Sequence, residues 1–153
     1  MQRRIFLKTS LAAAEYTLLL NAGLLTPRMV LADWPADAFH AGSLDEAMLA
    51  LAGGQPVVES DDIELDVPSI VEDGRSVPVS VRSHYEGTDT ISLFSEKNPN
   101  PAVGTFALDP ALEPRLDTRI KMGGSGFVIA LVGAKGKFYR TSKRARVTSG
   151  GCA

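Results

Sequence analysis

The feature that most limits the fold of this chain is a strict alternation of apolar and polar residues in short segments. In residues 63–67 every second residue is Ile, Leu or Val, with Asp or Glu between them, and residues 77–81 repeat the pattern with Val. Successive side chains of a β-strand point to opposite faces. Alternation over a few residues therefore predicts strands with one buried and one exposed face.

Five further segments continue the pattern towards the C-terminus and are separated by turn residues. The predicted strands are residues 91–94, 103–108, 116–122, 127–132 and 137–148. Pro78 suits an edge strand or the start of a strand, because proline cannot donate to a sheet ladder. Gly123-Gly124-Ser125-Gly126 falls between two predicted strands and indicates a turn rather than a phosphate-binding loop. Seven short strands with frequent turns predict an all-β, immunoglobulin-like antiparallel β-sandwich.

One short helix is expected before the strands. Ser43 and Glu46 have the spacing of a capping box, in which the serine caps the helix and the glutamate reaches back. Apolar residues follow at helical spacing up to Leu51, and Gly53-Gly54 ends the segment. The sequence therefore predicts a short N-terminal helix of about two turns that covers one end of the core.

Residues 1–32 have the composition of a twin-arginine signal peptide. Arg3-Arg4-Ile5-Phe6-Leu7-Lys8 precedes a modestly apolar stretch, and Val30-Leu31-Ala32 suits cleavage before Asp33. An amphipathic first helix of the domain would explain neither the arginine pair nor the cleavage site. The stretch is too short and too interrupted to span a bilayer. We expect export by the twin-arginine route, a periplasmic location and no membrane attachment after removal of the signal.

The remaining residues form one domain, 33–148, followed by a tail, 149–153. The signal contains four of the 16 basic residues and one of the 18 acidic residues, so 12 basic and 17 acidic residues remain, a formal charge of −5. This charge argues against nucleic acid as a partner, because phosphate binding needs a basic surface. A basic run at Lys143, Arg144 and Arg146 has two interpretations. It is either the solvated face of a strand or a cluster that attracts anionic substrates or acidic partners.

Cys152 is the single cysteine and the strongest candidate for chemistry. Gly150 and Gly151 precede it, have no side chains, and adopt both signs of φ, which predicts a slim, flexible C-terminal tail. In an oxidising compartment a lone cysteine forms no internal disulfide, so it is a free thiol, an intermolecular bridge or an attachment point. We expect a covalent carrier with Gly150 and Gly151 in its arm. The alternative is a structural or adaptor sandwich whose cysteine only forms an intermolecular disulfide.

Other chemistry has little support in the sequence. His40 and His84 are the only histidines, and neither has a second ligand at metal spacing, so no metal site and no cofactor site is expected. The acidic residues of segment 61–66 are interpreted as a solvated strand face rather than an acid–base pair. A mobile tail cannot hold Cys152 against a fixed imidazole. We therefore expect a substrate carrier acted on by other enzymes, not an enzyme.

Several long motifs resemble the SoxY family of sulfur-carrier subunits. They are the twin-arginine segment, Trp34-Pro35-Ala36-Asp37-Ala38-Phe39, Glu96-Lys97-Asn98-Pro99-Asn100-Pro101, Thr118-Arg119-Ile120-Lys121-Met122-Gly123 and Val147-Thr148-Ser149-Gly150-Gly151-Cys152. The tail departs from the family pattern Gly-Gly-Cys-Gly-Gly, since Ala153 follows Cys152.

The resemblance implies an immunoglobulin-like sandwich that forms a heterodimer with SoxZ in the periplasmic thiosulfate-oxidising system. It implies that Cys152 bears thiosulfate-derived intermediates. The implied transient partners are the haem enzyme SoxAX, the sulfate-releasing SoxB and, where present, a molybdenum sulfane dehydrogenase.

Overall fold

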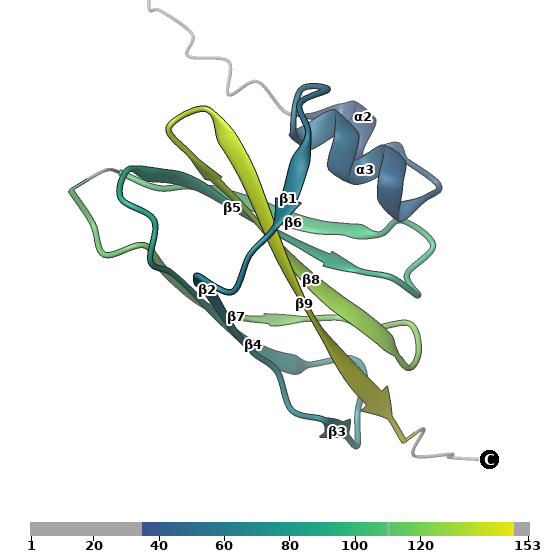
Figure 1. The fold of residues 1–153 in the computed structure, drawn as a ribbon. Coiled ribbons are helices and arrows are strands. Elements are labelled where there is room, and N and C mark those ends of the chain that lie inside the picture. The colour runs from purple at the N-terminus through teal and green to yellow at the C-terminus, as the bar shows by residue number, and fades with distance from the viewer. Residues whose placement is uncertain (1–34, 110, 149–153) are drawn as a thin grey trace, which may run out of the picture. The chain divides into compact units, whose positions relative to one another are not determined.

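Two β-sheets face each other, and two short helices lie on the outer side of the larger sheet (Figure 1). The computed structural model describes residues 35–109 and 111–148. The helices are α2 (Ala36–His40) and α3 (Leu44–Leu51). The strands are β1 (Val57–Glu59), β2 (Ile63–Asp66), β3 (Ile70–Val71), β4 (Val77–Ser83), β5 (Thr88–Ser95), β6 (Ala102–Ala107), β7 (Arg115–Ile120), β8 (Gly126–Ala134) and β9 (Lys137–Val147).

The larger sheet has the strand order β1-β9-β8-β5-β6, with β3 also paired to β9, and the smaller sheet has the order β2-β4-β7. All seven predicted strands are present, with ends within three residues of the predicted ones, and the immunoglobulin-like sandwich is confirmed. The sequence did not reveal β1, β3 or α2. Strands of three and two residues are too short for an alternation to be recognised. Both pair in parallel with β9, whereas the other strand pairs are antiparallel.

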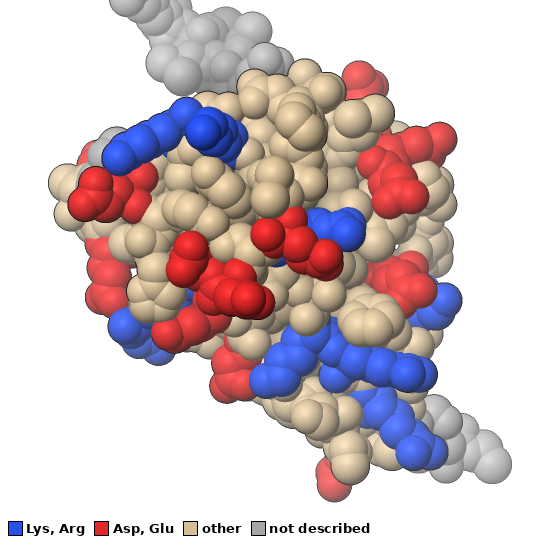
Figure 2. Space-filling view, viewed as in Figure 1, with Lys and Arg blue, Asp and Glu red and all other residues tan. Residues whose placement is uncertain are grey.

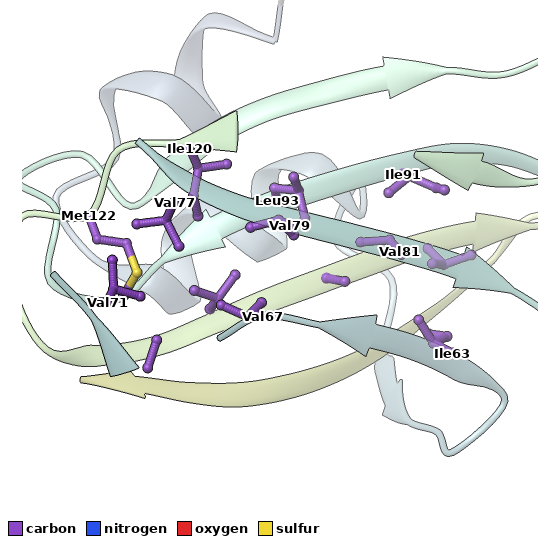
Figure 3. Close-up of a cluster of buried hydrophobic side chains, with 14 residues drawn as sticks. Ile63, Val67, Val71, Val77, Val79, Val81, Ile91, Leu93, Ile120 and Met122 are labelled. Atoms are coloured by element: carbon purple, nitrogen blue, oxygen red, sulfur yellow. The ribbon is translucent and has the colours of Figure 1, made fainter. Parts of the chain in front are cut away.

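The main core lies between the two sheets, where valine, isoleucine and leucine side chains meet (Figure 3). β4 contributes Val77, Val79 and Val81, each at most 3% exposed, and β8 contributes Val128, Ala130 and Val132 from the facing sheet. Alternate residues of these strands point into the same layer, as the period-two pattern predicts. Burial of these apolar side chains is the main contact between the two described sheets.

A second core lies on the opposite face of the larger sheet. Phe94, Ile129 and Leu131 alternate with the residues of the main core, so they point outwards, where Met48 of α3 and Phe39 cover them. The expectation that the helix covers one end of the core is therefore wrong. Strands β5 and β8 are apolar on both faces, and the outer face needs a covering layer.

Local sequence signals for α3 and Pro78 agree with the structure. Ser43 caps α3, and its Oγ accepts a hydrogen bond from the backbone N of Glu46 at 3.3 Å. β4 is the central strand of the smaller sheet, but its pairing with β2 covers only Ser80 to Ser83. Pro78 therefore has β7 as its only strand neighbour, and its missing N–H breaks no ladder bond. No helix within the described residues is long and apolar enough to cross a membrane.

Candidate functional site

The three residues predicted to carry the chemistry, Gly150, Gly151 and Cys152, lie outside the described residues, as do residues 1–32. Thr148 is the last residue before the tail that the structure describes. The site can therefore be built from the residues that hold Val147 and Thr148, which we call the arm root.

Ser125 holds Val147 from one side. The backbone N of Val147 donates to Ser125 Oγ at 2.9 Å, and the same hydroxyl donates to the backbone O of Val147 at 3.2 Å. The ladder between β8 and β9 ends at the pair Gly126–Ala145. A side-chain hydroxyl thus takes over where the strand partner ends, and it satisfies both backbone groups of Val147.

β3 holds the arm root from the other side. The backbone N of Thr148 donates to the backbone O of Val71 at 2.9 Å, and Thr148 Oγ1 donates to the same oxygen at 3.2 Å. One step earlier, the N of Arg146 donates to the O of Ser69 at 2.9 Å. The end of β9 is therefore hydrogen-bonded along both of its edges.

Asn98 joins the loops of the two sheets close to the arm root. Its Oδ1 accepts from the N of Gly123 at 2.7 Å, and its Nδ2 donates to the O of Lys121 at 2.9 Å. Asn98 lies between β5 and β6 of the larger sheet, and residues 121–123 follow β7 of the smaller sheet. One amide side chain, acting as both donor and acceptor, thereby links the two sheets at this end of the sandwich.

Two glycines allow the loops to come this close. A Cβ on Gly74 would lie 2.6 Å from the backbone O of Met122 and 3.2 Å from Cγ1 of Val147. A Cβ on Gly123 would lie 2.9 Å from the backbone O of Lys97. Both positions need glycine because backbone atoms occupy the space of a side chain.

Glu96 adds a charged contact on the outer face of the larger sheet. Its Oε2 accepts from the N of Phe127 at 3.0 Å, and its Oε1 lies 3.0 Å from Nζ of Lys97. The Phe127 hydrogen bond, then the bond with Lys97, lower the pKa of the Glu96 carboxyl from its ordinary value, because both favour the charged form.

The basic run predicted from the sequence lies on the last part of β9. Figure 2 shows lysine and arginine side chains gathered over this end of the strand. Lys143 Nζ pairs with Asp66 Oδ1 at 2.9 Å, while Arg144 and Arg146 are exposed. Neither arginine forms an ion pair with another residue that the structure describes.

Both histidines form local contacts, and the acidic side chains of the segment face solvent. His40 Nδ1 lies 2.7 Å from the O of Ala36, and His84 Nε2 lies 2.8 Å from Glu64 Oε1. The acidic residues of segment 61–66 are exposed, as predicted. Within residues 35–109 and 111–148, no group of three His, Cys, Asp or Glu residues could hold a metal ion.

Sequence reasoning missed the role of Ser125, Asn98 and Gly74 at the arm root. Asn98 and Gly123 lie in two of the motifs that carry the family resemblance, and the structure brings these motifs together. Ser125 and Gly123 lie in the segment interpreted only as a turn. Both residues lie just before predicted strand 127–132, and this position was the one sequence feature that indicated a place near the end of the C-terminal strand.

The family model for the sulfur oxidation protein SoxY matches residues 48–152, which is more than half of the chain. The chain belongs to the SoxY family. The matched range includes Gly150, Gly151 and Cys152 of this SoxY-family chain.

A solved structure supports the same assignment. The sulfur carrier protein SoxY from Chlorobium limicola f thiosulfatophilum is 35% identical, with a TM-score of 0.64, over 69% of this chain and 96% of that chain. A superoxide reductase (neelaredoxin) from Ignicoccus hospitalis is 18% identical, with a TM-score of 0.49, over 56% of this chain and 79% of that chain. This second similarity is too low to support a functional argument. No curated protein matches this SoxY-family chain.

Proposed function

We propose that this SoxY-family protein is a covalent sulfur carrier whose Cys152 holds thiosulfate-derived intermediates during thiosulfate oxidation. The observation that carries the proposal is the family match, which extends through Cys152. The solved relative is named as a sulfur carrier protein and is 35% identical. In this proposal the protein is a substrate for other enzymes and performs no turnover itself.

The arrangement at the arm root supports this function. A carrier must present a reactive group to several active sites, which is easier when its arm begins at a fixed point. Ser125 and Val71 bond the backbone of Val147 and Thr148 from opposite sides. Residues 149–153, with Gly150 and Gly151 before the thiol, are the proposed arm.

The chemistry at Cys152 is an oxidative coupling followed by hydrolysis. In the first step the thiol loses its proton, its Sγ forms a bond with the outer sulfur of thiosulfate, and two electrons pass to the haem enzyme SoxAX. The product is a Cys152 thiosulfonate. In the second step SoxB adds water to the terminal sulfonate, sulfate leaves, and a persulfide remains on Cys152. A sulfane dehydrogenase, where present, would oxidise that persulfide.

The proposed setting is a periplasmic heterodimer with SoxZ. The twin-arginine pattern of residues 1–32 supports export, and SoxZ is the partner that the family resemblance implies. The sandwich has sheet edges at β6 and β7, and pairing with another sandwich would cover such an edge.

The test is intact mass spectrometry of the protein purified from thiosulfate-grown cells. We expect mass additions of the thiosulfonate and sulfane types on Cys152 that a reductant removes, and no additions on Cys152→Ser. Adducts that persist on the serine variant would overturn the assignment. A wild-type protein that contains only a Cys152–Cys152 disulfide between two chains would also overturn it.

A further inference from the structure

The outer face of β9 near the arm root combines two unpaired arginines with two exposed apolar side chains. Arg144 and Arg146 are two residues apart, so they point to the same side of the strand, opposite to the buried Ala145. In the ladders, Arg144 lies beside Phe127 of β8, and Arg146 lies beside Ile70 of β3. Phe127 is 43% exposed and Ile70 is 67% exposed. We call these four residues the β9 root face.

The helices cover a different part of the same sheet face. α3 and the residues around it pack on Phe94, Ile129 and Leu131. Phe127 precedes Ile129 by two residues on β8, so it continues the same outward row towards the arm root. The apolar character of the row thus extends beyond the part that the helices bury.

The charge of the β9 root face is opposite to that of the molecule as a whole. Residues 33–153 have a formal charge of −5. Most other basic side chains of the described residues pair with a carboxylate, as Arg140 does with Glu59 at 3.6 Å. Glu96 is the carboxylate that faces Arg144, and it already bonds Phe127 N and Lys97. Figure 2 shows the resulting basic patch at the end of β9, whereas acidic side chains and smaller basic groups are interspersed over the rest of this view.

From this arrangement, and on the basis of the function proposed above, we propose that the β9 root face is the docking surface for the enzyme that loads Cys152. The partner surface that fits is acidic with an apolar centre, at the rim of the channel that receives the arm. Arginine and aromatic residues are enriched in protein interfaces. Because the domain as a whole is acidic, an acidic rim would be attracted mainly to the basic patch at the arm root, which orients the encounter. A small docking surface also suits a carrier that must leave each enzyme again.

The β9 root face could instead bind a small anion, and a reaction that needs no enzyme distinguishes this from protein docking. Tetrathionate forms the same Cys152 thiosulfonate without an enzyme. The thiolate attacks one of the two central sulfurs, the central S–S bond breaks, and thiosulfate leaves with the electron pair. If the arginines acted by drawing small anions to the thiol, their loss would slow this reaction too.

The experiment compares Arg144→Glu/Arg146→Glu with Lys135→Glu/Lys137→Glu. The control changes the same charge at the opposite end of the β8–β9 hairpin. Each mature variant is paired with a SoxZ homologue. SoxAX and thiosulfate then load it at ionic strengths of about 0.1 M and 1 M, where the Debye length is roughly 10 Å and 3 Å.

We expect kcat/KM for loading of the arginine variant to fall at least about tenfold at the lower ionic strength and to approach the wild type at the higher one. The lysine control and the tetrathionate reaction of both variants should stay within about threefold of wild type. The uncharged variant Phe127→Ser/Ile70→Ser should load more slowly at both ionic strengths, because apolar contact is not screened by salt.

Four results would overturn the proposal. They are loading of the arginine variant at the wild-type rate, an equal fall in the tetrathionate reaction, undiminished loading of the Ser variant, and loss of the SoxZ heterodimer in the arginine variant. The last result would assign the face to SoxZ. Failure of the wild type itself to accept sulfur from SoxAX would instead contradict the function proposed above.

Discussion

The hydroxyl of Ser125 bonds both backbone groups of Val147, accepting from its N at 2.9 Å and donating to its O at 3.2 Å. Neither group has a ladder partner on β8, because the β8–β9 ladder ends at Ala145. On the β8 side, the point at which β9 ends and the proposed arm begins is therefore held by one side chain outside the strand.

Ser125→Ala should loosen this point without changing the fold. The two bonds are exposed, so the expected loss in free energy of unfolding is only about 1 kcal/mol. Amide hydrogen exchange of Val147 should become faster, while that of Thr148, which bonds Val71, should change less. Ser142→Ala, an exposed serine on the same strand, is the matched control. Unchanged exchange at Val147 would contradict the role of Ser125.

Gly74→Ala should destabilise the protein by about 1–3 kcal/mol, because the new Cβ would lie 2.6 Å from the O of Met122 and close to Val147. Gly42→Ala meets nothing within 4 Å and provides the control, with an expected change below about 0.5 kcal/mol. Denaturant unfolding measures both. Equal stability of the two variants would mean that the loop moves aside freely.

Glu96 should make stability depend on pH. Its pKa in the folded protein is lowered, first by the Phe127 N–H and then by Lys97. The charged carboxylate therefore stabilises the fold at pH values above its ordinary pKa of about 4.5, and this contribution is lost as the pH falls through the lower folded pKa.

Unfolding free energies of wild type and Glu96→Gln, measured from neutral pH down to about pH 3, test this linkage. The wild type should lose more stability on acidification than Glu96→Gln, whereas Glu72→Gln, an exposed control, should follow the wild type. Parallel pH curves for wild type and Glu96→Gln would rule out the contribution.

Gly150→Val/Gly151→Val tests whether the arm must be slim. The four residues past Thr148 extend at most ~3.3–3.6 Å each, so the thiol reaches roughly 13–14 Å from the arm root. Two valines keep this length but add bulk and restrict φ and ψ. Loading by SoxAX should fall at least about tenfold, roughly 1.4 kcal/mol of barrier. Alkylation of Cys152 by a small reagent should be unchanged, and undiminished loading would show that the glycines are incidental.

The sequence predicts the sandwich well because burial on one face leaves a period-two pattern that is visible in each strand, as in β4 and β2. It does not predict β1 or β3, because two or three residues show no period. Their parallel pairing with β9 depends on contacts between residues about 75 or more positions apart. The position of α3 follows from β5 and β8, which are apolar on both faces. The outer face of these strands needs a covering layer, and α3 provides it.

For the site, the sequence predicts Cys152 and its glycines through residue type and order, and these residues lie outside the described ones. It could not show that Asn98 and Gly123, 25 positions apart, share a hydrogen bond, or that Phe127 and Ile70 flank the two arginines. Those relationships come from strand register, which a single sequence does not encode position by position.

The bonding of β9 along both edges has a further consequence for register. If β9 slipped by one residue against β8, Arg144 and Arg146 would turn into the core and Ala145 would turn to solvent. Such a slip would also break the parallel pairs with β1 at one end of the strand and with β3 at the other. The register of β9 therefore sets how many residues follow the strand. The maximum reach of the Cys152 thiol from Thr148 depends on that number, and an insertion or deletion after Thr148 would change it by about 3.3–3.6 Å per residue.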